Sequence, residues 1–131
     1  MTIRSIMLAA ASVTLMMTGG AMAANYAGGV IKSVTVGGHE MLTDGQGRTL
    51  YVYDQDGPGV SNCNGLCRLA WPPQRAANGA KASGNFAPVE ANGGPIWAFK
   101  GHPLYRFSGD HKAGDVKGDG AEGIWHAALV R

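Results

Sequence analysis

The sequence contains one ten-residue pattern twice: residues 47–56 read Gly47-Arg48-Thr49-Leu50-Tyr51-Val52-Tyr53-Asp54-Gln55-Asp56, and residues 101–110 read Gly101-His102-Pro103-Leu104-Tyr105-Arg106-Phe107-Ser108-Gly109-Asp110. Both copies have a Leu-Tyr pair, an aromatic residue two positions after the Tyr and an Asp five positions after it. The register continues, because Trp71 and Trp125 each lie 15 residues beyond that Asp (71 − 56 and 125 − 110). This repetition indicates a domain built from two similar units, each too small to bury its apolar face alone.

The repeated stretch has the residue pattern of a β-strand. Tyr51 and Tyr53 in one copy, and Tyr105 and Phe107 in the other, alternate with the residues between them. Each copy therefore places two aromatic rings on one strand face. An aromatic strand face must pack against something, and the other copy is the largest apolar surface in so short a chain. We expect Tyr51 and Tyr105 to be buried in a core that both copies share.

The rest of the chain predicts further short strands and almost no helix. Strand patterns occupy residues 30–36, 41–43, 95–100 and 124–130. Residues 66–70 have the pattern of a single helical turn, which the following Pro-Pro pair would end. Two longer segments, 54–65 and 72–84, carry no strand pattern. The second of them is rich in Ala, Asn and Gly, and we interpret it as the linker between the copies.

These patterns predict an all-β fold, a single antiparallel β domain that is either a sandwich or a small barrel. It should consist of two pseudo-equivalent repeats, at about 30–73 and 86–130, that pack around a pseudo-two-fold axis. The loops at 54–65 and 108–123 would then occupy equivalent places. In a superposition of the copies, Trp71 should fall near Trp125.

The N-terminal residues have the composition of a secretory signal peptide. Arg4 supplies a positive charge, residues 6–17 are almost wholly apolar, and Ala21-Met22-Ala23 fits a cleavage site. We predict a signal peptide at 1–23 and a β domain at 24–131. The apolar run falls short of the roughly 20 residues that span a bilayer, and no Cys near the cleavage site could carry a lipid. We therefore expect a periplasmic or secreted protein with no stable membrane anchor.

The charge of the chain argues against a nucleic-acid partner. The whole chain has 11 Lys and Arg against 9 Asp and Glu, and removing Arg4 leaves 10 against 9, a net charge of +1. Proteins that bind nucleic acids usually carry a strong excess of basic residues. We expect the partner to be a component of the cell envelope or a small ligand.

Cys63 and Cys67 are the sharpest local feature of the chain. In an exported protein with two cysteines, the pair predicts a disulfide that closes a tight loop. The alternative is copper or redox handling by the two thiols, with His102, His111 and His126 as further weak candidate ligands. The spacing of these histidines matches no metal motif. We therefore predict a disulfide and no cofactor.

The motif residues themselves allow a structural and a functional interpretation. Asp56 and Asp110 end the repeated stretch, where Asp side chains commonly accept backbone N–H groups in Asx-turns. Brought together across the pseudo-dyad, they would instead form the paired carboxylates of a hydrolase. The aromatic residues predict core packing, with a ligand-stacking platform as the alternative. The acidic residues of the second loop, Asp110, Asp115, Asp119 and Glu122, do not follow the spacing of a calcium loop.

Several separated motifs carry a family resemblance. They are Gly-x-x-Leu-Tyr-x-(Tyr/Phe)-x-x-Asp twice, Ser61-x-Cys63-x-Gly65-x-Cys67 before Trp71-Pro72-Pro73, and Gly114-Asp115-Val116-x-Gly118 before Trp125-His126. In this order they resemble the bacterial secreted-repeat family of predicted envelope lipoproteins named for a Tyr-x-(Phe/Trp/Tyr)-x-x-Asp motif. The resemblance covers nearly all of the mature chain. It implies an exported bacterial envelope protein whose family has no known biochemical activity and supplies no catalytic residues.

The chain departs from the lipoprotein members of that family in lacking a lipobox Cys. We expect an exported envelope protein that acts as a non-enzymatic binding or structural module. The alternative is periplasmic copper or redox handling through Cys63 and Cys67 with histidine ligands.

Overall fold

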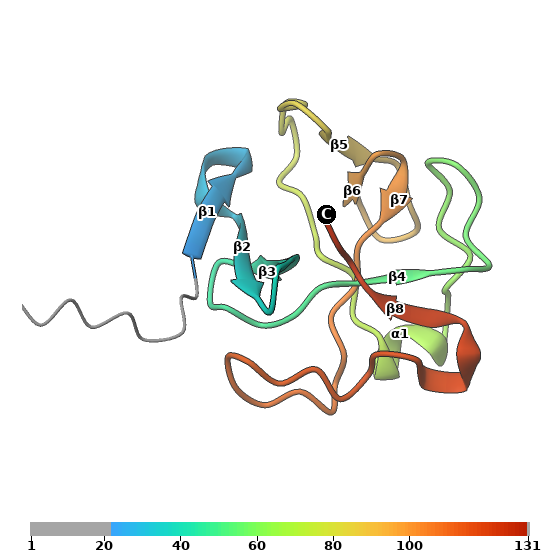
Figure 1. Cartoon of the computed structure of the whole chain (residues 1–131). Coiled ribbons are helices and arrows are strands. Elements are labelled where there is room, and N and C mark those ends of the chain that lie inside the picture. The colour runs from blue at the N-terminus through green and yellow to red at the C-terminus, as the bar shows by residue number, and fades with distance from the viewer. Residues whose placement is uncertain (1–21, 131) are drawn as a thin grey trace, which may run out of the picture.

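The computed structural model describes residues 22–130, so most of the predicted signal peptide lies outside the described residues. Three small antiparallel sheets form the fold (Figure 1). The first contains β1 (Met22–Tyr26), β2 (Ile31–Val36) and β3 (His39–Asp44), the second β4 (Tyr51–Tyr53) and β8 (Trp125–Ala127), and the third β5 (Phe86–Val89), β6 (Ile96–Phe99) and β7 (His102–Pro103). The helical segments are η1 (Ala27–Gly29), α1 (Cys67–Ala70) and η2 (Ala121–Gly123).

The predicted all-β class is confirmed, and so are most of the predicted elements. The pattern at 30–36 and 41–43 forms the β2–β3 hairpin, in which Val36 pairs with His39 across a two-residue turn. Both turn residues, Gly37 and Gly38, have positive φ angles of 59° and 82°, a conformation that glycine adopts without steric cost. The predicted helical turn is α1. Within residues 22–130 the three sheets do not join into a closed barrel.

The two repeats exchange their C-terminal segments. β8 of the second repeat pairs with β4 of the first, where Tyr53 lies opposite Trp125 and the Asp54 N–H donates to the carbonyl of Ile124 at 2.9 Å. The equivalent residues, at an offset of 54 (108 − 54 and 124 − 70), make the same contact with the repeats interchanged: the Ser108 N–H donates to the carbonyl of Ala70 at 2.8 Å. Each repeat therefore completes its partner's pairing rather than its own.

The exchange is centred on the two tyrosines of the motif. The Tyr51 N–H donates to the Tyr105 carbonyl at 2.7 Å, and the Tyr105 N–H donates to the Tyr51 carbonyl at 2.9 Å. Equivalent residues that bond each other in both directions lie on a two-fold axis, as in an isologous interface. This pair therefore marks the pseudo-dyad. Tyr105 makes isolated bridges to Tyr51 and Pro73 and belongs to no strand, so the strand predicted in the second copy forms only in part.

The interpretation of 72–84 as a simple linker is wrong for its first residues. Pro73 forms a bridge with Tyr105, and Arg75 forms one with Ile96. The Ala76 N–H also donates to the carbonyl of Pro95 at 3.0 Å. Residues 72–76 are thus the exchanged segment of the first repeat, and the connection between repeats begins after them.

The apolar core has two parts. One part lies between the outer sheets and consists of Ile31, Leu42, Leu50, Ala76, Phe86, Trp97, Phe99, Leu104 and Ala128. The other surrounds the pseudo-dyad and consists of Tyr51, Cys63, Trp71, Tyr105, Trp125 and Ala127. The predicted burial of both tyrosines is confirmed, since Tyr51 and Tyr105 are fully buried.

The predicted cleavage point lies inside a strand. β1 includes Met22 and Ala23, whose backbones pair with Thr35 and Val34. Cleavage after Ala23 would leave the last three residues of β1 paired with β2. No helix among residues 22–130 is long and apolar enough to cross a membrane.

Candidate functional site

Four aromatic rings of the repeated motif form a column across the pseudo-dyad. Trp71 and Trp125 stack at its centre, with ring centroids 3.8 Å apart and an interplanar angle of 3°. Tyr53 stacks on the outer side of Trp125 at 4.2 Å, and Phe107 lies on the outer side of Trp71 at 4.5 Å. Tyr51 meets the column edge-on at Trp71. We call Tyr53, Trp125, Trp71 and Phe107 the aromatic column.

The column is assembled from alternating repeats. Tyr53 of the first repeat stacks on Trp125 of the second, and Phe107 of the second repeat lies on Trp71 of the first. Edge-to-face and offset stacked rings each add roughly 0.5–1.5 kcal/mol beyond the burial of their surface. The aromatic motif therefore stabilises the contact between the repeats, as core packing predicts.

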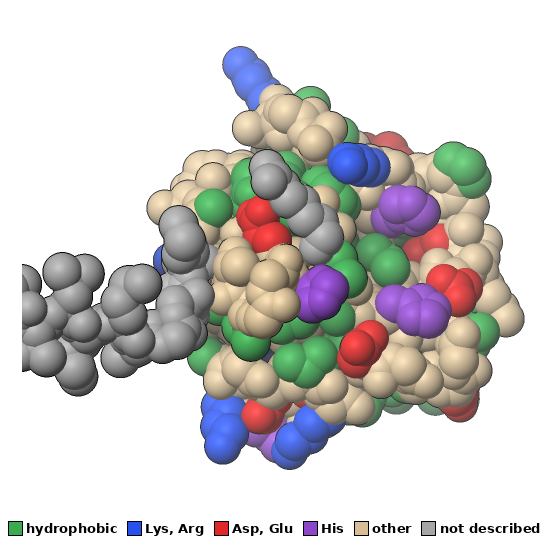
Figure 2. Space-filling model, viewed as in Figure 1, with side chains coloured by type: hydrophobic (Ala, Val, Ile, Leu, Met, Phe, Trp, Pro, Cys, Tyr) green, Lys and Arg blue, Asp and Glu red, His purple; other side chains and the backbone are tan. Residues whose placement is uncertain are grey.

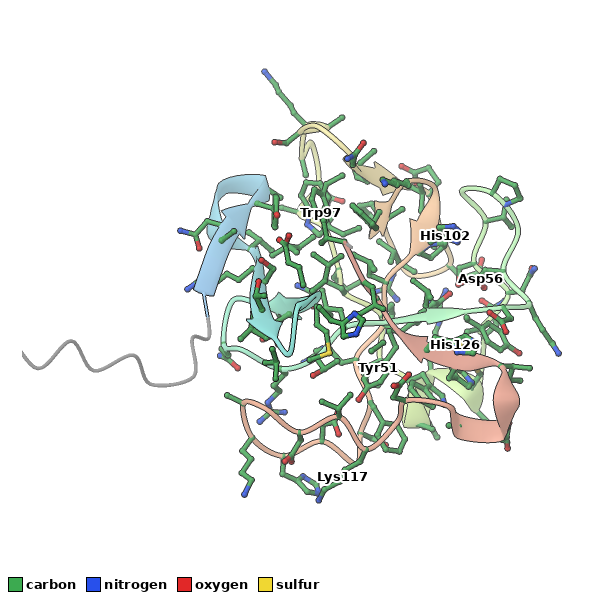
Figure 3. The ribbon with its side chains drawn as sticks, in the orientation of Figure 1. Tyr51, Asp56, Trp97, His102, Lys117 and His126 are labelled. Atoms are coloured by element: carbon green, nitrogen blue, oxygen red, sulfur yellow. A yellow bond between two sulfur atoms is a disulfide. The ribbon has the colours of Figure 1, made fainter. Side chains whose placement is uncertain are left out.

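The motif carboxylates are exchanged in the same way. The Tyr51 hydroxyl donates to Asp110 Oδ2 at 2.5 Å, and the Tyr105 hydroxyl donates to Asp56 Oδ2 at 2.7 Å. Each tyrosine therefore bonds the aspartate of the other repeat. We call these two pairs the tyrosine–aspartate interlock. Figure 3 shows Tyr51 in the interior and Asp56 nearer the edge of the molecule.

The second oxygen of each aspartate accepts a backbone N–H group. Asp56 Oδ1 accepts the N–H of Asn62 at 2.7 Å, and Asp110 Oδ1 accepts that of Lys117 at 2.9 Å. The expected acceptance of backbone donors is confirmed, but these donors lie six and seven residues along the chain (62 − 56 and 117 − 110), which is too far for an Asx-turn. Each carboxylate instead closes the long loop that follows the repeated ten-residue stretch of its own repeat.

Burial sets the electrostatics of the interlock. Desolvation raises the pKa of the Tyr51 phenol, and its hydrogen bond to the Asp110 carboxylate raises that pKa further. Desolvation likewise raises the pKa of Tyr105. The pKa of the Asp56 carboxyl is also raised by burial, although the Asn62 N–H and the Tyr105 hydroxyl act in the opposite direction. Both phenols therefore stay protonated as donors at neutral pH.

The loop that follows β4 in the first repeat is held by covalent and polar contacts. Cys63 and Cys67 form the predicted disulfide, with their Cα atoms 5.3 Å apart. Arg68 Nε donates to the Cys63 carbonyl at 2.8 Å. The Ser61 hydroxyl lies 2.6 Å from the Tyr105 hydroxyl, and since the latter donates to Asp56, Ser61 is the donor of this bond. Ser61 appeared only as part of the motif before Trp71, and its hydrogen bond was not predictable because its partner, Tyr105, lies in the other repeat.

The equivalent loop of the second repeat, residues 108–123, is held by close packing instead. The Gly118 N–H donates to the Tyr51 hydroxyl at 3.2 Å. A Cβ added to Gly118 would lie 2.7 Å from Trp71 Cη2 and 3.0 Å from Phe107 Cγ, so only glycine fits against the aromatic column. The signal for this residue in the sequence was its place in the Gly114-to-Gly118 motif before Trp125.

The weak metal candidates do not come together. Both cysteines are in the disulfide, and among residues 22–130 no group of three His, Cys, Asp or Glu side chains is placed to hold a metal ion. His126 Nε2 lies 2.8 Å from Asp54 Oδ2 in an exposed pair. Figure 2 shows histidines beside acidic side chains on this face, and Figure 3 places His102 and His126 there. An exposed pair of this kind adds at most about 1 kcal/mol.

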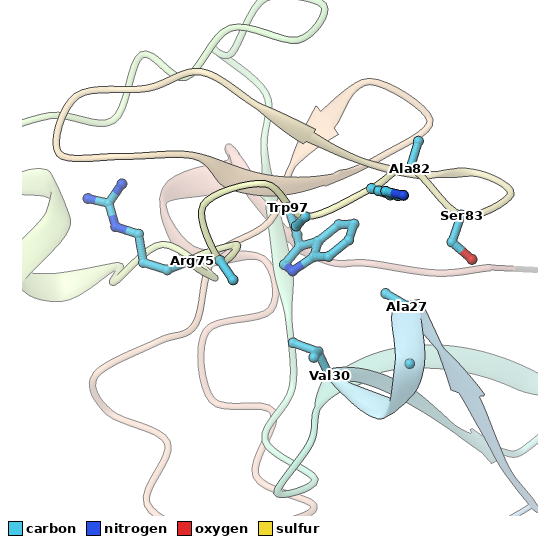
Figure 4. A pocket seen from close by; sticks show the side chains of 10 residues that line it. Ala27, Val30, Arg75, Ala82, Ser83 and Trp97 are labelled. Atoms are coloured by element: carbon cyan, nitrogen blue, oxygen red, sulfur yellow. The ribbon is translucent and has the colours of Figure 1, made fainter.

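Two hollows of ligand size have no residue of the aromatic column or the interlock in their lining. One, of about 560 Å³, is lined by Trp97, Arg75 and Lys81, with Ala27 and Val30 opposite (Figure 4). Another, of about 490 Å³, lies over the β2–β3 hairpin and includes Lys32 and Val34 in its lining. Volumes of roughly 300–1,000 Å³ are typical of small-molecule sites. The sequence did not predict these hollows, because each is lined by segments that are distant along the chain.

The fold and the interlock define a class of protein: two β repeats joined by exchanged segments and by reciprocal tyrosine–aspartate bonds. Residues 32–74 and 89–129 match the family described as a secreted repeat of unknown function, and because these segments make up more than half of the chain, the protein belongs to that family. The two matched segments correspond to the two predicted repeats. No curated protein and no solved structure matches the chain.

Proposed function

We propose that this secreted repeat protein is a non-enzymatic binding module of the bacterial envelope, in which the motif residues maintain the fold. The observation that supports this proposal is the interlock. Asp110 is 2% exposed, and its two oxygens accept the Tyr51 hydroxyl and the Lys117 N–H. A carboxylate used in this way has no free oxygen for a substrate. The motif therefore serves assembly, and binding falls to the surfaces around it.

The hydrolase alternative gains no support from the motif carboxylates. Asp56 and Asp110 each accept the hydroxyl of a different tyrosine. Paired catalytic carboxylates would face one scissile bond from either side. Here each carboxylate is directed to the tyrosine of the other repeat.

The location that we propose is the periplasm or the extracellular space. The apolar N-terminal run and the Ala21-Met22-Ala23 site support export, and the disulfide suits an oxidising compartment. Intact-mass measurement of exported protein should show a chain that starts near Ala24 and carries the disulfide. Retention of residues 1–23 in a membrane fraction would contradict this proposal. Free thiols that take up copper stoichiometrically would favour the copper alternative instead.

A stability measurement separates the structural role of the carboxylates from a catalytic one. Asp110→Asn removes a hydrogen-bonded buried charge and turns an amide donor toward the Tyr51 hydroxyl or the Lys117 N–H. We expect the free energy of unfolding to fall by about 2–3 kcal/mol. Catalytic residues are commonly suboptimal for stability, and replacing them often stabilises an enzyme. A variant more stable than the parent in urea unfolding would therefore contradict the proposed function.

A further inference from the structure

The cavity of about 490 Å³ lies between the outer face of the β2–β3 hairpin and the second loop. On the hairpin, Val34 pairs with Met41 and Lys32 pairs with Thr43, so these four side chains share one sheet face. Ala113 and Val116 of the second repeat complete the lining opposite them. The cavity therefore depends on both repeats.

The interior of this cavity is apolar in effect. Its threonine hydroxyls are already engaged, since Thr43 Oγ1 donates to the Asp44 carbonyl and Thr49 Oγ1 donates to the Asp115 carbonyl, each at 2.8 Å. The Ser33 hydroxyl likewise donates to Glu40 at 2.8 Å. A ligand would therefore meet methyl and methylene groups over most of this wall, and its buried part must be apolar.

One cation lines this cavity. Lys32 is the charged side chain in the lining, and within residues 22–130 it forms no ion pair. The nearby acids Asp44 and Asp115 accept backbone N–H groups of their own loops. An apolar interior with one unpaired cation, Lys32, in its lining is complementary to an amphiphile with an anionic headgroup.

The equivalent loop of the other repeat is bonded to its hairpin. There the Gly59 N–H donates to the Gly101 carbonyl at 2.7 Å, and a Cβ added to Gly59 would lie 3.8 Å from Val89 Cγ1. Gly59 corresponds to Ala113, since the offset is 54 residues (113 − 59), and Gly101 corresponds to Gly47 (101 − 47). At the cavity, the Ala113 methyl group meets Gly47 instead. The first loop is therefore hydrogen-bonded to Gly101, whereas the second loop meets Gly47 through the Ala113 side chain.

We propose that this cavity binds a single-chain anionic amphiphile, with the alkyl chain between Val34 and Val116 and the carboxylate at Lys32. The inference rests on the proposal that the protein is a binding module, and it names the ligand class and the site. The alkyl chain supplies apolar contact, and Lys32 supplies a charge-assisted hydrogen bond.

Calorimetric titration of the exported protein with dodecanoate, below its micelle concentration, tests the proposal. We expect one binding site. Lys32→Glu should weaken binding by about tenfold or more, because it replaces an attractive contact with a repulsive one. The matched control is Lys81→Glu, which reverses a cation of the separate cavity beside Trp97. It should leave dodecanoate affinity unchanged.

Two further ligands separate tail from headgroup. Dodecyltrimethylammonium has the same tail with a positive headgroup and should bind much more weakly, and butanoate, with the same headgroup and a short tail, should not bind measurably. Val34→Trp fills the cavity and should abolish dodecanoate binding. If this variant does not fold, as judged by circular dichroism, Lys32→Glu still tests the proposal, because the Lys32 side chain is half-exposed.

Three results would overturn the proposal: no binding of dodecanoate, equal binding of the cationic analogue, or a larger effect of Lys81→Glu than of Lys32→Glu. None of them concerns the interlock. If dodecanoate fails to bind while Asp110→Asn destabilises the protein, the ligand class is wrong and the non-enzymatic module stands. If Asp110→Asn stabilises the protein, the proposed function fails whatever the cavity binds.

Discussion

The two halves of the tyrosine–aspartate interlock have the same chemistry in different surroundings. Tyr51 and Asp110 are both buried, and the Gly118 N–H completes the bonding of the Tyr51 hydroxyl. Asp56, the partner of Tyr105, is half-buried, and Ser61 donates to the Tyr105 hydroxyl. One pair is sealed in the core, and the other is within reach of solvent.

The difference shows how two copies of one motif can diverge while the contact between them is kept. The first loop is held by a disulfide, and the second by Gly118 against the aromatic column. At the offset of 54 residues, Cys63 and Cys67 correspond to Lys117 and Ala121. The pseudo-symmetric contacts are therefore those between the repeats, and the asymmetric ones fix the loops outside them.

The central tryptophans give the largest expected effect and test the symmetric part. Trp71→Ala and Trp125→Ala each remove a stacked ring from the column. Each should lower the free energy of unfolding by about 3–5 kcal/mol, because the cavity left behind lies between two packed repeats. Urea unfolding followed by far-ultraviolet circular dichroism measures both. Losses that differ greatly between the two variants would contradict the symmetry of the column.

Removing one hydroxyl from each interlock pair sharpens the asymmetry. Tyr51→Phe leaves Asp110 Oδ2 and the Gly118 N–H without a partner in the core, and should cost about 2–3 kcal/mol. Tyr105→Phe leaves Oδ2 of the half-buried Asp56 without its tyrosine partner, but water can reach this carboxylate. The free energy of unfolding should therefore fall by only about 1 kcal/mol. The same unfolding measurement compares them. A larger loss for Tyr105→Phe would reverse the assignment of the sealed pair.

Removing the disulfide tests how far the first loop depends on this covalent bond. Replacing both Cys63 and Cys67 with Ala should lower stability by no more than about 2 kcal/mol, because a loop of this size confines little of the unfolded chain. The fold should remain, since the second loop keeps its place with no cysteine at all. Global unfolding of this variant at 25 °C would show that the bridge does more than hold one loop.

Alkaline pH tests both buried phenols together. The folded protein raises the pKa of Tyr51 and Tyr105, so the unfolded chain loses these protons first, starting near pH 10. The contribution of the two phenols to the free energy of unfolding is therefore fully present below that pH and is lost as the pH rises. The loss is about 1 kcal/mol for each tyrosine at one pH unit above the unfolded pKa. Urea midpoints at several pH values measure the slope. A Tyr51→Phe, Tyr105→Phe double variant should show a smaller decline, and an equal decline would contradict the assignment.

The sequence by itself determined that the chain has two equivalent β units, that their tyrosines are buried and that Cys63 pairs with Cys67. These features follow from local signals: a repeated register, an alternating aromatic face and two cysteines close together in an exported chain. The helical turn before Trp71 was predictable for the same reason, because a proline pair follows it.

The tertiary structure alone decided which repeat supplies each partner. The sequence motif is the same whether Tyr51 bonds Asp56 of its own repeat or Asp110 of the other, because both arrangements use the same donors and acceptors. The structure has the exchanged arrangement, in which Trp71 and Trp125 also stack across the repeats. The cavity is also a tertiary feature, since its lining combines the β2–β3 hairpin of the first repeat with Ala113 and Val116 of the second. Residues so far apart along the chain meet only through the folding of the backbone, so no local pattern predicts the cavity.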